Sequence, residues 1–143
     1  MKSYILVFLQ FFIIFLMTLP LGASSETLEL GLVVFAIGAF IGILAIYKNR
    51  PGNFNVRPII KEECVLVTDG IYSYIRHPMY ASVLLMSASL VIIYPVKAEF
   101  VLYAALVVVL LLKMLYEESL WKCEDPEYLH YIQRTKRVIP YIF

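Results

Sequence analysis

The sequence LVTDGIYSYIRHPMYAS, residues 66–82, joins a polar segment to an apolar run. A Thr-Asp-Gly turn leads into residues 71–75, whose alternating pattern predicts a short extended segment. Pro78 favours the first turn of a helix, where its missing N–H would have no partner, and it restricts His77 to extended backbone angles. Arg76 and His77 are therefore predicted at a helix N-terminus, where free N–H groups favour an anionic or hydrogen-bonding ligand.

The remainder of the chain is strongly apolar, since 62% of its 143 residues are hydrophobic and 16% are charged. This composition predicts a single all-α integral membrane domain over residues 1–143. A net charge of +1 and the lack of a basic stripe argue against nucleic acid as a partner. Cys64 and Cys123 form no CxxC pair, and their spacing from His77 and His130 resembles no zinc signature, so we expect neither a disulfide nor a metal site.

Four apolar runs are long enough to be predicted as transmembrane helices: residues 4–21, 30–47, 79–93 and 99–116. The third and fourth are separated by a tight reversal at 94–98 and are expected to form a helical hairpin. The first run also fits a cleavable signal peptide, although its length favours a retained helix. Small residues in the second run, among them Gly31, Gly38 and Gly42, predict close packing against another helix.

Lysine and arginine residues predict the orientation of these helices. They gather in the loop 48–78 and in the tail 117–143, whereas the other two loops carry only Lys97. By the positive-inside rule, the loop, the tail and both termini are expected in the cytoplasm.

The tail 117–143 has the pattern of an amphipathic helix. Asp125, Pro126 and Glu127 predict the helix start, with Asp as the N-cap and Pro as the first helical residue. Four apolar or aromatic residues then share one predicted face: Tyr128, Leu129, Tyr131 and Ile132. This helix is expected to lie along the inner membrane face and close over residues 66–78.

Glu117 and Glu118 directly follow the fourth apolar run, one turn after Lys113. One interpretation is a pair of interfacial acids, with Lys113 snorkelling to meet Glu117. The other is a carboxylate that receives hydroxyl or ammonium groups of a polar ligand. The predicted hairpin brings its two ends together, so the acids, Arg76 and His77 are expected to share one cytoplasmic pocket.

Residues 66–80 resemble the signature of the isoprenylcysteine carboxyl methyltransferase family and are similar to that of the related phospholipid N-methyltransferases. The resemblance covers residues 50–140. It extends to the family's order in the tail, Glu117-Glu118, Tyr128, Tyr131, Arg137 and Pro140, and to its bacterial branch at Asn53-Phe54 and Pro58. Two positions differ from the family pattern: Ser82 replaces a frequent Gly, and Lys113 replaces a frequent Arg, which gives up bidentate recognition.

The resemblance implies an S-adenosylmethionine-dependent enzyme that methylates a carboxylate or thiol of a lipophilic, isoprenoid-like acceptor in the bacterial inner membrane. It implies these cofactor-binding residues: Tyr74, His77, Pro78, Met79, Tyr80, Glu117, Glu118 and Tyr128. It implies these catalytic residues: Arg76, His77, Glu117 and Arg134. The tail residues Tyr128, Tyr131, Arg134 and Arg137 would cap the pocket or meet the substrate. The sequence contains no Gly-rich Rossmann loop, so the soluble-enzyme mode of cofactor binding is not expected.

Two other functions remain open from the sequence. The enzyme could instead methylate the amine of a phospholipid, or the chain could be a non-catalytic transporter or assembly subunit. The acceptor and the oligomeric state are not predicted.

Overall fold

A computed structural model describes residues 2–19, 22, 27–49 and 65–143. These residues form five α-helices and one short 3-10 helix: α1 (Lys2–Met17), α2 (Leu28–Lys48), η1 (Gly70–Ser73), α3 (Pro78–Ile93), α4 (Lys97–Glu124) and α5 (Glu127–Arg134). The described ranges contain no strand, only one isolated parallel bridge between Ile75 and Lys136, so the predicted all-helical class is confirmed. Residues 50–64 of the predicted loop 48–78, including Cys64 and the Asn53, Phe54 and Pro58 positions, lie outside the described residues.

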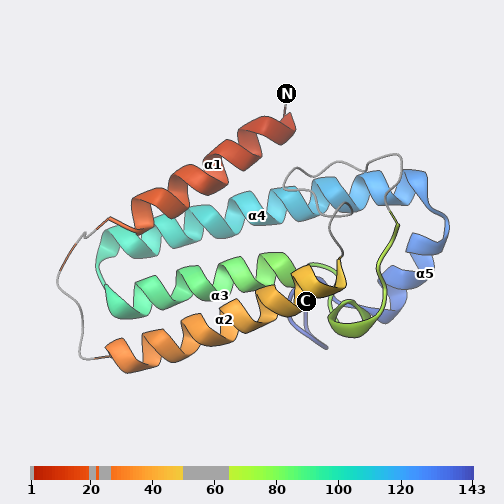
Figure 1. Ribbon diagram of the computed structural model, residues 1–143. Helices are drawn as coiled ribbons and strands as arrows, with labels where there is room; N and C mark the ends of the chain where they lie inside the picture. The colour runs from red at the N-terminus through yellow and green to blue at the C-terminus, as the bar shows by residue number, and fades with distance from the viewer. Residues whose placement is uncertain (1, 20–21, 23–26, 50–64) are drawn as a thin grey trace.

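The four long helices lie side by side in the order α1, α4, α3, α2 (Figure 1). α3 and α4 are joined by only three residues, 94–96, so the start of α3 and the end of α4 lie at the same end of the bundle. η1 and α5 also lie at that end (Figure 1). The core between α1, α3 and α4 includes Ile13, Val91, Leu106 and Leu110. The short α3–α4 connection therefore places the start of α3 next to the end of α4, although the two are far apart in the sequence.

Glycines allow α2 to pack closely against α3, as the sequence predicts. A Cβ added at Gly38 would lie 3.0 Å from the backbone nitrogen of Met86, and one at Gly31 would lie 2.4 Å from Cγ1 of Ile93. A larger side chain at Gly38 would push against the backbone of α3, and one at Gly31 would require the Ile93 side chain to move. α2 is thus held directly against the helix that begins at Pro78.

Two of the helices, α2 and α4, are long and apolar enough to cross a membrane. α1 and α3 are also apolar, but each has 16 residues, or about 24 Å at 1.5 Å per residue, against a hydrocarbon core of about 30 Å. Four complete spans therefore remain a prediction. α4 has 28 residues, or about 42 Å, so the helix continues beyond the predicted span, which ends at residue 116. The helix continues through both acids because no breaker occurs before Pro126.

Two other local predictions need correction. Residues 71–75 are not an extended segment, because Gly70 has a φ of 61° and starts η1, in which Ser73 Oγ donates a hydrogen bond to the Gly70 carbonyl at 2.7 Å. The predicted apolar face of α5 is only partly buried: Tyr128 is buried, whereas Leu129 is 51% exposed. α5 begins close to the predicted position.

Candidate active site

The segment after α5 covers the turn that precedes α3. Backbone N–H groups of Arg76 and His77 donate to the carbonyls of Lys136 and Arg137, at 2.7 and 2.9 Å. Lys136 N–H donates in return to the carbonyl of Tyr74 at 3.2 Å. These bonds confirm that the tail closes over residues 66–78, and they fix the backbone on either side of Arg76.

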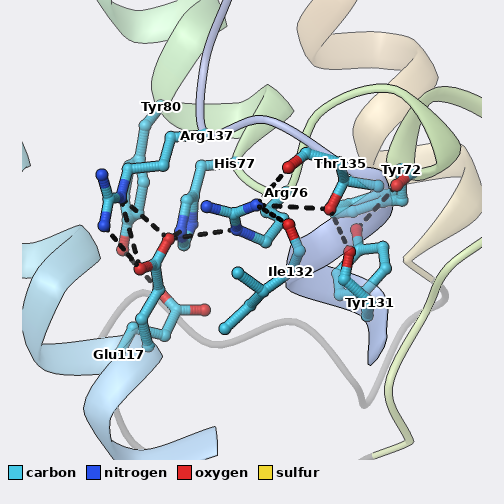
Figure 2. A network of polar contacts seen from close by, with 10 residues as sticks. Tyr72, Arg76, His77, Tyr80, Glu117, Tyr131, Ile132, Thr135 and Arg137 are labelled. Atoms are coloured by element: carbon cyan, nitrogen blue, oxygen red, sulfur yellow. Dashed lines mark hydrogen bonds and ion pairs between the residues drawn. The ribbon is translucent and has the colours of Figure 1, made fainter. Parts of the chain in front are cut away.

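A second connection runs from α5 to η1. The hydroxyl of Tyr131, which is buried, donates to the backbone carbonyl of Tyr72 at 2.7 Å (Figure 2). Burial raises the pKa of Tyr72, Tyr128 and Tyr131, and the charges of Glu117 and Glu118 raise those of Tyr72 and Tyr128 further. These three phenols therefore stay protonated, which keeps the Tyr131 hydroxyl available as the donor to the Tyr72 carbonyl.

Glu118 is the centre of a buried polar network, and its partners Arg76, His77 and Arg137 are labelled in Figure 2. Its carboxylate accepts hydrogen bonds from Arg76 Nε and from Arg137 Nη2, each at 3.1 Å, and lies 3.3 Å from His77 Nε2. The side chain is only 2% exposed, so the two guanidinium groups compensate the cost of burying its charge. All three partners come from outside α4, and Glu118 thus ties the α3 start and the tail to the end of α4.

Arg76 is held by the same network and by the tail. Its Nη1 donates to the carbonyls of Ile132 and Thr135 and to the hydroxyl of Thr135. Thr135 is buried and its hydroxyl also donates to the Tyr131 carbonyl. Most donors of the guanidinium are therefore engaged within the protein, which indicates that Arg76 holds the site together.

Glu117 has a different environment from its neighbour. It is half-buried, lines a cavity and accepts a hydrogen bond from the Tyr80 hydroxyl at 3.0 Å. Adjacent helical residues point about 100° apart, so Glu117 faces the cavity while Glu118, which does not line it, faces the tail. Of the two acids, Glu117 is the one that a ligand can reach.

The cavity has a volume of about 530 Å³, within the range of small-molecule sites. One end is polar and aromatic, with Tyr72, His77, Tyr80, Glu117 and Tyr128 in its wall. The other end lies between α1 and α3, where the walls are largely apolar and include Phe11, Ile14, Val83, Met86 and Leu90. This shape suits an amphiphilic ligand, or two ligands of which one is polar and the other apolar.

Most of the residues predicted for the site are found there. Arg76, His77, Pro78, Met79, Tyr80, Glu117, Tyr128 and Tyr131 line the cavity, and Glu118 and Arg137 belong to the network beside it. Two predicted residues are placed elsewhere: Tyr74 is 60% exposed, Arg134 is exposed at the end of α5, and neither lines the cavity. Arg137, three residues after Arg134, makes the ion pair with Glu118.

Several lining residues were not predicted as site residues, notably Gln10, Tyr72, Lys113 and Trp121. The signal for Gln10 was present, since a lone polar residue in an apolar run usually has a buried partner. Lys113 does not snorkel as predicted: it is 1% exposed, donates a hydrogen bond to Gln10 Oε1, and lies 5.3 Å from the centre of the Tyr80 ring. Packing of α1 on α4 covers this lysine.

A family model described as phospholipid methyltransferase matches residues 27–122. No curated protein and no solved structure matched the chain. The matched region spans two thirds of the chain, including the α3 start and both acids, and leaves out α1 and α5. Membership of the isoprenylcysteine carboxyl methyltransferase branch stays a prediction. The chain belongs to the phospholipid methyltransferase family, which together with its two long apolar helices makes it a membrane methyltransferase.

Proposed function

We propose that the protein transfers a methyl group from S-adenosylmethionine to the polar head of a lipophilic acceptor held in the same cavity. The observation that carries this proposal is the two-ended cavity, in which the Tyr80–Glu117 pair lies at the polar end and an apolar wall continues between α1 and α3. A polar donor and an apolar acceptor can thus approach each other from opposite ends.

The residues at the polar end fit S-adenosylmethionine. The Glu117 carboxylate is an acceptor for its ammonium or ribose hydroxyl groups. Tyr72, Trp121 and Tyr128 are aromatic surfaces for its adenine ring or its cationic sulfur. When bound, this cofactor supplies a methyl group carried on a positively charged sulfur. In the first turn of α3, the backbone N–H groups of Met79 and Tyr80 are the candidate donors to its carboxylate, because Pro78 has no N–H and the N–H of Ala81 donates to the His77 carbonyl.

The chain's own residues orient the reactants and exclude water. Glu118 holds His77 and Arg76 in place, and Tyr80 holds Glu117 toward the cavity. The tail covers this end through the Tyr131 hydrogen bond. A site that aligns the reacting groups and removes water from the nucleophile supplies most of the assistance that a methyl transfer needs.

The preferred acceptor is a carboxylate or thiol on an isoprenoid-like tail. A carboxylate loses no proton during the transfer, whereas a thiol first releases its proton to solvent and attacks as the thiolate. In either case His77, whose Nε2 lies 3.3 Å from Glu118, is not required as a base. The apolar wall formed by Ile14, Val83 and Met86 suits the tail. We place the polar end and both termini on the cytoplasmic side of a bacterial inner membrane, in agreement with the distribution of basic residues.

A phospholipid amine is the second candidate acceptor. The description of the matching family favours it. An amine must lose a proton before it attacks, and Glu117 is the carboxylate in the cavity that could accept that proton.

Methyl-labelled S-adenosylmethionine distinguishes these candidates. The purified protein is incubated with the labelled cofactor and a bacterial membrane extract, and the extract is then treated with base. Release of volatile label indicates a methyl ester, whereas label that stays on a lipid amine indicates N-methylation. Calorimetric titration with S-adenosylmethionine provides an independent check. Absence of both binding heat and label transfer would favour a non-catalytic transporter or assembly subunit and refute the proposal.

A further inference from the structure

α1 lies outside the region that the family model matches, yet it forms one wall of the cavity. Its Gln10 is 6% exposed and interrupts an apolar run that extends from residue 5 to residue 17. A buried carboxamide costs free energy unless it is hydrogen-bonded. The partner is the ammonium group of Lys113, one turn before Glu117 on α4. This helix therefore contributes a polar group to the site as well as apolar surface.

The contact between the two side chains fixes the direction of the carboxamide. Lysine can only donate, so the Gln10 oxygen faces Lys113 and the two amide N–H groups point elsewhere. Among the residues that the structure describes, the Gln10 amide nitrogen has no hydrogen-bond partner. Both residues line the cavity. The cavity wall thus carries a cation and a pair of amide donors side by side.

The position of Lys113 along α4 determines which part of a bound ligand the Gln10–Lys113 pair can contact. Lys113 lies about 6 Å before Glu117 along α4, in the direction of the apolar wall formed by Ile14 and Met86. Glu117, one turn after Lys113, accepts a hydrogen bond from Tyr80 and also acts electrostatically on Lys113. The pair consequently lies where the head of an acceptor would be if its tail occupied the apolar end.

We propose that Gln10 is a positioning residue that holds Lys113 toward the cavity, so that the two side chains together bind an oxyanion of the acceptor. This inference rests on the proposed function, because it concerns the acceptor of that reaction. The oxyanion is either the phosphate of a phospholipid or the carboxylate of an isoprenoid acid, and both accept hydrogen bonds from an ammonium and an amide.

The protein's only tryptophan allows a binding test that needs no turnover. Trp121 lines the cavity, so its fluorescence reports occupancy. The full chain, in an uncharged maltoside detergent, is titrated with dodecyl phosphate, dodecanoate and dodecanol, which share one tail. We expect at least one of the anions to bind about tenfold more tightly than the alcohol, as for one charge-assisted hydrogen bond.

Two substitutions test the role of Gln10. Gln10→Glu keeps the size but pairs its own carboxylate with Lys113, and Gln10→Leu removes the hydrogen bond. In both variants we expect the affinity for the anion to exceed the affinity for dodecanol by less than about twofold, because the charge-assisted hydrogen bond to the anion is lost. The control is Ile13→Ala, because Ile13 lies in the α1–α4 core and does not line the cavity. This control should lower the melting temperature and keep the anion preference.

Equal affinity of the wild type for the alcohol and both anions would overturn the inference, as would a full preference in Gln10→Glu. If either Gln10 variant fails to fold, Lys113→Met decides, since it too must lose the preference. Whichever anion binds more tightly identifies the source of the oxyanion. An anion preference without cofactor binding or methyl transfer would remove the proposed function and keep this site, so the two failures are distinguishable.

Discussion

Replacing Glu118 with glutamine tests whether this carboxylate fastens the tail to the bundle. The wild-type side chain is 2% exposed and accepts from Arg76 and Arg137 while lying beside His77. Glutamine has almost the same size, but it carries no charge and only one of its two terminal atoms accepts hydrogen bonds. The substitution therefore leaves two guanidinium groups without their counter-ion and changes the packing very little.

The expected cost follows from these contacts. Removing one partner of a buried ion pair destabilises proteins by about 3–5 kcal/mol. Arg137 is 29% exposed and can regain water, and Arg76 keeps its bonds to the Thr135 and Ile132 carbonyls, so we reduce this figure to about 2–4 kcal/mol. If that cost falls on local opening of the tail, the opening equilibrium increases about 30-fold to 700-fold.

Hydrogen exchange measures this opening directly. The backbone amides of Arg76, His77 and Lys136 are protected by bonds between the α3 start and the tail, and their exchange can be followed by mass spectrometry of peptides that contain them. The matched control is Glu124→Gln, an exposed acid on the same helix, which should leave exchange unchanged. Exchange of the three amides within about threefold of wild type would show that Glu118 does not hold the tail.

Three further predictions follow from the remaining contacts. Glu117→Gln should lower methyl transfer by about tenfold or more, because a charge-assisted bond in the cavity is lost, while the melting temperature stays the same; full activity would remove Glu117 from the site. Gly38→Val should destabilise the α2–α3 packing by about 1–3 kcal/mol, since the added atoms collide with the Met86 backbone at 3.0 Å, and a melting temperature equal to wild type would contradict this geometry. In a Cys64→Ser background, Cys123, which is exposed near the end of α4, should react with a membrane-impermeant maleimide in inverted vesicles and not in intact cells, and the reverse result would place the active site on the outer face.

The sequence by itself determined the parts of the fold that depend on local chemistry. Apolar composition and run length predict the helices, and Pro78 predicts where α3 begins, as the structure confirms. The motif at 66–80 and the acid pair indicate the methyltransferase relationship that the family match supports. A tight reversal between two apolar runs is also enough to predict that Arg76 and Glu117 approach each other.

Only the tertiary structure decided which member of each local group performs which role. Glu117 and Glu118 have the same chemistry and adjacent positions, and they differ because α3 packs beside one while the tail packs beside the other. Arg137 rather than Arg134 reaches the network because the chain leaves α5 before it returns over the α3 start. Partners separated by dozens of residues leave no periodic pattern in the sequence, so contacts such as Gln10–Lys113 depend on how the helices pack.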